Sequence, residues 1–151
     1  MVILGADLSY TRTGLVWYET ASNLVVHHQA VSIPTGSKRM LRAAKAFHRV
    51  ISPHKTDLVV IEDAAYGAPS RTTVVKLAEL AGVFKFVLES HGIDYLLTSP
   101  TLIKKWVTGK GTAEKHIVAR ELKRRYGIHF KDDPGNDLSD AAALAAWGAN
   151  R

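Results

Sequence analysis

Cysteine is absent from the 151 residues of this chain. Disulfides and thiolate metal sites are therefore excluded, although the redox compartment stays open. The apolar runs are far shorter than the ~20 residues that a membrane-spanning helix needs, so we expect no transmembrane segment. Residues 1–8 lack the basic start and long apolar stretch of a signal peptide. We therefore expect a cytoplasmic protein.

The sequence also lacks internal repeats, low-complexity tracts and Pro/Gly-rich linkers. Residues 1–151 are accordingly expected to form one domain, and a domain of this size buries roughly 68–70% of its unfolded surface. Acidic residues are the minority charge, because the net charge is +6 and the pI is about 9.7. That balance favours an anionic partner, most commonly nucleic acid, with an acidic membrane surface as the competing possibility.

Hydrophobic periodicity predicts five strands. Aliphatic and aromatic residues fill 2–8, 14–20 and 24–33 between turn signals, the pattern of a three-stranded meander. Residues 57–62 have a continuously apolar middle, which is typical of a parallel strand buried on both faces. Residues 94–98 form the fifth predicted strand.

Helical spacing is found in the remaining segments. Met40, Ala44, Phe47 and Ile51 recur on one helix face. Helices are also expected over 72–91, from the N-cap pair Ser99-Pro100, over 113–126 and over 137–148. Because hairpins give antiparallel pairs and crossovers give parallel ones, this order predicts an α/β fold with a mixed sheet and helices on both faces.

Four acids stand where strands end or a helix begins: Asp7, Glu62, Asp137 and Asp140. Each also has a simpler explanation, as a turn carboxylate, a solvated strand end, or the N-cap and N3 residues of a helix. Together they would repel one another unless protons or cations intervene. An all-oxygen site favours Mg²⁺ or Mn²⁺ over zinc. The neighbouring Asp132-Asp133 is expected to be a solvated loop.

These acids belong to a longer ordered pattern: Ile3-Leu4-Gly5-Ala6-Asp7 with Thr13-Gly14, Val59-Val60-Ile61-Glu62, Gly109 to Lys115, and Asp137-Leu138-Ser139-Asp140. The pattern resembles the RuvC family of Holliday-junction resolvases, within the ribonuclease H-like superfamily. The resemblance implies a ribonuclease H-like fold with a five-stranded mixed sheet of order 3-2-1-4-5. Ala6 and Leu8-Ser9 depart from the Ile-Asp-Pro-Gly run of bacterial members.

The resemblance also implies roles for individual residues. Asp7, Glu62, Asp137 and Asp140 correspond to metal-binding catalytic acids. From the chemistry of an all-oxygen site we expect them to hold two Mg²⁺ ions, with Mn²⁺ as a substitute. Lys104 and Lys115 correspond to catalytic, DNA-contacting lysines, although Lys105 could take the place of Lys104. Further predicted DNA contacts are Tyr66, as a base-stacking aromatic or a plain loop tyrosine, with Arg71 and Lys110, and a basic set comprising Lys38, Arg42, Lys45, Arg49, Lys123, Arg124 and Arg125.

The implied function is paired cutting of four-way DNA junctions by a homodimer. Helix 72–91 is the candidate dimer interface, or else a helix buried in the monomer core. The main alternative is a flap or branched-DNA nuclease of the same superfamily, since the shared acids fix chemistry and not substrate. Lesser alternatives are a non-catalytic nucleic-acid-binding module and a fragment of an actin-like ATPase. Compact members occur in bacteriophages, so a phage origin is a further expectation.

Overall fold

The computed structural model describes residues 1–63 and 70–151. The strands are β1 (Val2–Asp7), β2 (Arg12–Glu19), β3 (Leu24–Ser32), β4 (Leu58–Glu62) and β5 (Tyr95–Thr98). The helices are α1 (Arg39–Ile51), α2 (Arg71–Ser90), α3 (Pro100–Thr108), α4 (Lys115–Tyr126) and α5 (Asp137–Ala149). None of the helices in these two ranges is long and apolar enough to cross a bilayer.

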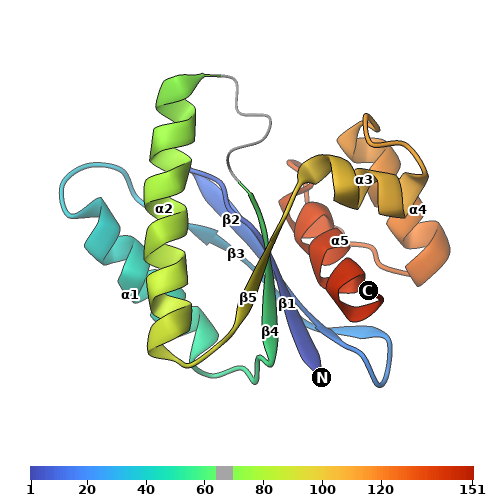
Figure 1. Ribbon diagram of the computed structural model, residues 1–151, viewed down its shortest axis with the longest axis horizontal. Helices are drawn as coiled ribbons and strands as arrows, with labels where there is room; N and C mark the ends of the chain where they lie inside the picture. The colour runs from blue at the N-terminus through green and yellow to red at the C-terminus, as the bar shows by residue number, and fades with distance from the viewer. Residues whose placement is uncertain (64–69) are drawn as a thin grey trace.

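The strands form one mixed sheet in the order β3-β2-β1-β4-β5. β1, β2 and β3 pair antiparallel, as the short turns between them require, whereas β1 pairs parallel with β4 and β4 with β5. This order confirms the predicted topology. It places the first and fourth strands side by side in the middle of the sheet (Figure 1).

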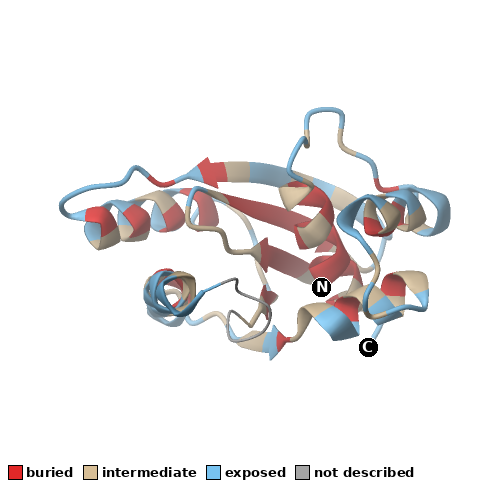
Figure 2. Ribbon diagram, turned by 90° about the horizontal axis from the view of Figure 1, so that it is seen from above, coloured by how far each residue is buried: buried red, intermediate tan, exposed pale blue. Residues whose placement is uncertain are grey.

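Helices cover both faces of the sheet, as predicted. α1 and α2 lie on one face, where Phe47 and Phe84 pack edge to face with ring centroids 4.8 Å apart. α5 lies on the other face, with α3 and α4 outside it (Figures 1 and 2). The central strands are buried by both layers, which explains their continuously apolar sequences.

α2 is less completely covered than its apolar sequence suggests. It turns Leu80, Phe84 and Leu88 into the core, each with an exposed fraction of 0%. The opposite side leaves Val75 at 52% and Phe86 at 67% exposed. The helix therefore has both a core side and an apolar outer side.

α5 approaches the sheet unusually closely because glycines lie beneath it. A Cβ atom placed on Gly5 would lie 1.9 Å from the carbonyl oxygen of Ala141, and one on Gly14 would lie 2.2 Å from that of Asp137. The helix contributes fully buried alanines to the same contact. These small residues let the helix backbone lie directly on β1 and β2.

The ends of α2, α4 and α5 differ from the predictions by one or two residues. α4 begins at Lys115 rather than at Ala113, within the usual uncertainty of helix boundaries. Asp133 lies in a loop, as predicted, but it is half-buried and its carboxylate is not simply solvated. Its carboxylate accepts hydrogen bonds from the backbone N–H of Leu138 at 3.0 Å and from both the N–H and hydroxyl of Ser139 at 2.9 and 2.8 Å. Asp133 therefore caps α5, satisfying N–H groups that have no partner within the helix.

Candidate active site

Asp7 and Glu62 end two adjacent parallel strands at the same edge of the sheet. The last register pair of β1 and β4 joins Ala6 to Ile61, one residue before each acid. Side chains alternate along a strand, so Asp7 shares a face with Ile3 and Glu62 shares a face with Val60. Both apolar residues pack in the cluster that contains α5. The two acids therefore point to the α5 side of the sheet.

The first turn of α5 brings the other two acids to this edge. Asp137 is the first residue of the helix and Asp140 lies one turn further on the same side. Close contact between Gly14 and the Asp137 backbone fixes where that turn begins. Because Asp133 provides the cap, neither Asp137 nor Asp140 is used to cap the helix.

Two lysines face the acids from the outer helices. Lys115 Nζ lies 2.5 Å from Asp140 Oδ2. Lys115 and Lys104 line one pocket of about 240 Å³ together with Glu62 and Asp140. Lys105 is exposed and is not among the residues lining this pocket. Of the two lysines that the sequence left open, Lys104 is the one that reaches the site.

Crowding of the acids changes their protonation. Burial, followed by the charges of Asp140 and Glu62, raises the pKa of Asp7 from 3.8 to about 8. Burial and the charge of Asp140 also raise the pKa of Glu62, although Lys115 and Lys104 oppose this. Burial raises the pKa of Asp140 against the hydrogen bond from Lys115. The site thus holds more acid than its own cations can neutralise.

The pKa of Lys115 shows the same balance from the basic side. Burial disfavours its ammonium, but the hydrogen bond and charge of Asp140, with the charges of Asp7 and Asp137, outweigh burial and raise the pKa. Lys115 is therefore a fixed positive charge at neutral pH, and it lines the pocket together with Glu62 and Asp140.

The donor set suits a hard divalent cation. Its oxygens are all carboxylate, and their mutual repulsion would be relieved by a cation. Within residues 1–63 and 70–151, no three His, Asp or Glu side chains are gathered tightly enough to hold an ion as they stand. The ammonium of Lys115 instead contacts Asp140, and Arg12 Nη1 lies 3.8 Å from Asp137 Oδ2. Asp7, Glu62, Asp137 and Asp140 could hold a metal once their side chains turn toward one another and these two cations are released.

The other predicted DNA contacts lie away from the pocket. Arg71 begins α2 and Lys110 follows α3; both are exposed, and neither lines the pocket. Tyr66 lies outside the described residues. Four members of the basic set, Lys38, Arg42, Lys45 and Arg49, lie on or just before α1, which covers the opposite face of the sheet from α5.

The basic end of α4 is partly neutralised within its own helix. Glu121 accepts hydrogen bonds from Arg124 at 2.8 and 3.0 Å and from Arg125 at 3.3 Å. The hydrogen bond from Arg124 is the largest cause of the lowered pKa of Glu121. Arg124 and Arg125 are consequently less available to phosphate groups than their charge alone suggested.

The sequence reasoning missed Arg12 as a member of this site. Arg12 begins β2 and is half-buried, and it shares a strand face with Gly14 and Val16, which face α5. Strand alternation counted back from Gly14 would have placed it toward the acids. Its signal was hidden because Arg12 falls within the turn signal Thr11-Arg12-Thr13-Gly14, and the second strand was predicted to begin only at residue 14.

A family model for the crossover junction endodeoxyribonuclease RuvC matches residues 3–147. The chain belongs to the RuvC family. RuvC of Clavibacter michiganensis is 31% identical over 151 residues, covering 96% of this chain and 74% of that protein. RuvC of Mycobacterium ulcerans is 30% identical over 152 residues, covering 96% and 81%. The prediction of a junction-resolving RuvC-type nuclease is confirmed, and with it a metal-dependent nuclease activity.

Solved structures show the same fold. The Thermus thermophilus RuvC in complex with a Holliday junction substrate superposes with a TM-score of 0.81 at 21% identity, covering 97% of this chain and 91% of that one. The Fowlpox virus resolvase in complex with Holliday junction DNA gives a TM-score of 0.62 at 13% identity, covering 99% and 97%. The ribonuclease H-like arrangement predicted from the sequence is thus shared with two structures of resolvases.

Proposed function

We propose that this chain cuts four-way DNA junctions at the pocket beside Asp140, and that Asp7, Glu62, Asp137 and Asp140 hold Mg²⁺ there. The observation that carries the proposal is the convergence of acids from β1, β4 and α5 with Lys104 and Lys115 on one pocket edge. The proposal includes two ions per site and Mn²⁺ as a substitute. When bound, such ions activate a water molecule and stabilise the leaving oxygen of a phosphodiester.

The residues of the chain would act in a definite order. Ion binding requires Asp7 to lose the proton that its raised pKa retains, so affinity for the ion should increase with pH. A cation held by Asp140 would also release Lys115 from that carboxylate. The freed ammonium, with that of Lys104, lies where it can contact a phosphate entering the pocket. The two lysines would then hold the phosphate and offset charge that develops on its oxygens.

The DNA partner in this proposal is a branched junction. RuvC of Thermus thermophilus and the Fowlpox virus resolvase were each solved with junction DNA. The net charge of +6 suits contacts with phosphates on the arms of such DNA. A flap nuclease with the same site is the alternative that substrate comparison would detect. The expected location is the cytoplasm, where the protein would act as a single domain.

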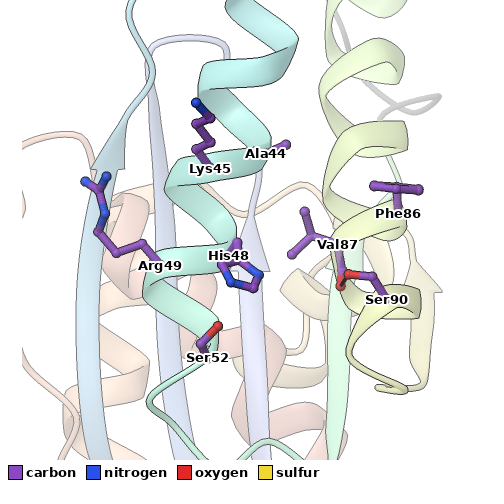
Figure 3. A pocket seen from close by; sticks show the side chains of 8 residues that line it. All are labelled: Ala44, Lys45, His48, Arg49, Ser52, Phe86, Val87 and Ser90. Atoms are coloured by element: carbon purple, nitrogen blue, oxygen red, sulfur yellow. Dashed lines mark hydrogen bonds between the residues drawn. The ribbon is translucent and has the colours of Figure 1, made fainter.

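Paired cuts on opposite strands need two active sites, so we propose a homodimer. The outer side of α2 is the candidate interface, because Val75 and Phe86 are exposed there. Phe86 also borders a hollow of about 580 Å³ between α1 and α2, with His48 and Val87 on its walls (Figure 3). An apolar side chain next to a hollow gives a second copy both a knob and a recess to pack against.

The experiment compares a synthetic four-way junction, a 5′ flap and a linear duplex of the same sequence in Mg²⁺. The junction should be cut near its centre into nicked duplexes. Equal cutting of all three substrates would exclude junction resolution, and preference for the flap would support the alternative.

Asp137→Asn should abolish cleavage while leaving junction binding in EDTA unchanged, because the amide keeps the shape but not the charge that holds a cation. Asp132→Asn, an exposed acid outside the site, is the matched control. Cleavage by Asp137→Asn at the wild-type rate would show that Asp137 is not a ligand of the metal.

A further inference from the structure

The loop of residues 8–11 connects two residues of the site. It follows Asp7 directly and leads into Arg12, whose guanidinium faces Asp137. It contains neither glycine nor proline. Asp7 is paired with Gly14 across β1 and β2, so what holds the loop bears on the direction of its side chain rather than on its place in the sheet.

Arg39, the first residue of α1, makes the contacts that hold it. The Arg39 guanidinium stacks over the Tyr10 ring with Cζ 3.6 Å from the ring centre. Its Nη2 donates a hydrogen bond to the carbonyl oxygen of Tyr10, and its Nη1 donates to that of Ile33 at 3.2 Å. One side chain thus ties the loop after β1 to the end of β3.

The burial of Arg39 suggests that this arrangement has a purpose beyond solubility or core packing. Its exposed fraction is 6%, although a buried charge is costly unless hydrogen bonds offset the loss of water. The contacts described for the guanidinium are two carbonyl oxygens and an aromatic face, and its Nε has no hydrogen-bond partner among the described residues. An apolar side chain would fill the same space at lower cost, but it could not fix two carbonyl groups.

A second helix reaches the same ring. Lys76 Nζ of α2 lies 5.0 Å from the centre of the Tyr10 ring. The other end of the loop is closed locally, because the Thr13 hydroxyl accepts a hydrogen bond from Ser9 N–H and donates one to Ser9 C=O, each at 3.4 Å. The strong contacts of the loop are therefore those of Tyr10.

We propose that Arg39, acting through Tyr10, is a positioning residue for the nuclease centre. It holds loop 8–11 so that the Asp7 carboxylate stays directed at the first turn of α5. The inference rests on the proposed function of Asp7. Its structural part, the fixing of the loop, can be measured without any catalysis.

The test compares Tyr10→Leu, which removes the ring, with Tyr10→Phe, which keeps it, and with Arg39→Lys, which keeps the charge without the planar guanidinium. Hydrogen exchange of the amides of residues 8–11 should become at least about tenfold faster in Tyr10→Leu and Arg39→Lys. In Mg²⁺ their kcat for junction cleavage should fall about 10- to 100-fold, the effect of a displaced reacting group. The KM and the junction affinity in EDTA should stay within about twofold of wild type, and Tyr10→Phe should behave as wild type.

Lys55→Met is the matched control, because it removes an exposed positive charge just before β4, far along the sheet from the acids. The proposal is overturned if loop exchange and kcat of the folded variants match wild type, or if Tyr10→Phe loses as much kcat as Tyr10→Leu. It is also overturned if KM rises while kcat is kept, which would make Arg39 a DNA-binding residue. A wild-type protein that fails to cut junctions would refute the proposed function instead, while the exchange measurement would still report on the loop.

Discussion

Replacing Asp7 by Asn should stabilise the metal-free protein while destroying its activity. The folded chain keeps a proton on Asp7 until about pH 8, whereas an unfolded chain loses it near pH 3.8. At pH 7 this difference in pKa destabilises the folded protein by about 4 kcal/mol, because the unfolded chain ionises freely and the folded chain does not. Asn avoids this cost, but its buried amide must still be taken out of water, which offsets part of the gain. We therefore expect a gain of about 2 kcal/mol at pH 7, or about 4–8 °C in Tm for a chain of this size.

The sign of the pH dependence follows from the raised pKa. The contribution of Asp7 to wild-type stability should be most favourable below pH 4. It should become steadily less favourable as the pH rises toward 8, because the unfolded chain ionises first. Asp7→Asn has no such group. The difference in stability between the two proteins should therefore widen from pH 5 to pH 8 and level off above it.

The assay is urea denaturation in EDTA at pH 5, 6, 7 and 8 for wild type, Asp7→Asn and Asp94→Asn, an exposed acid that makes the same charge change outside the site. Mg²⁺ at ten times its Kd should then stabilise wild type by about 1.4 kcal/mol and leave Asp7→Asn unchanged. A difference that is equal at pH 5 and pH 8, or an Asp7→Asn protein that is less stable than wild type, would refute the electrostatic reasoning.

Three further predictions concern the packing of α5 on the sheet, the cap of α5 and the dimer interface. Gly14→Ala should lower the free energy of unfolding by about 1–3 kcal/mol and reduce cleavage, because the added Cβ would lie 2.2 Å from the Asp137 carbonyl oxygen. Gly82 lies on α2 and has no atom within 4 Å of an added Cβ, so Gly82→Ala should instead raise the free energy of unfolding by about 0.5–1 kcal/mol in the same denaturation experiment. Asp133→Ala should cost about 1–2 kcal/mol through loss of the α5 cap, whereas Asp132→Ala should change stability by less than about 0.5 kcal/mol. Phe86→Ser should shift sedimentation from dimer toward monomer while single-strand nicking persists, and an unchanged dimer would place the interface elsewhere.

The sheet could be predicted from the sequence because its signals are local and strong. The apolar runs of β1 and β4 mark buried parallel strands. The hairpins that lie between them in the sequence leave few possible strand orders for the sheet. The acids were found for the same reason, since each follows an apolar run or opens an Ala-rich helix. The three-dimensional convergence of Glu62 with Lys104 and Lys115 came from family resemblance, because α3 and α4 are positioned by packing that no local pattern records.

The missed residues share a different physical cause. Asp133 acts through three hydrogen bonds and Arg12 through one ion pair across a turn, and such contacts depend on backbone geometry rather than on composition. Asn136 illustrates this, because its φ of 57° bends the chain so that Asp133, and not the residue adjoining the helix, reaches the free N–H groups. Arg39 was missed because a basic residue beside an exposed basic stripe is indistinguishable from it in sequence.

Because Asp133 caps α5, the residue that stabilises the start of this helix is different from the acids proposed to bind the metal. Since Asp133 satisfies the helix end, the amide variant Asp137→Asn keeps the hydrogen bonds on which the helix depends. A variant that binds branched DNA without cutting it would serve as a capture reagent. Immobilised on beads, it could retrieve intact branched DNA from cell extracts and reveal where recombination intermediates accumulate.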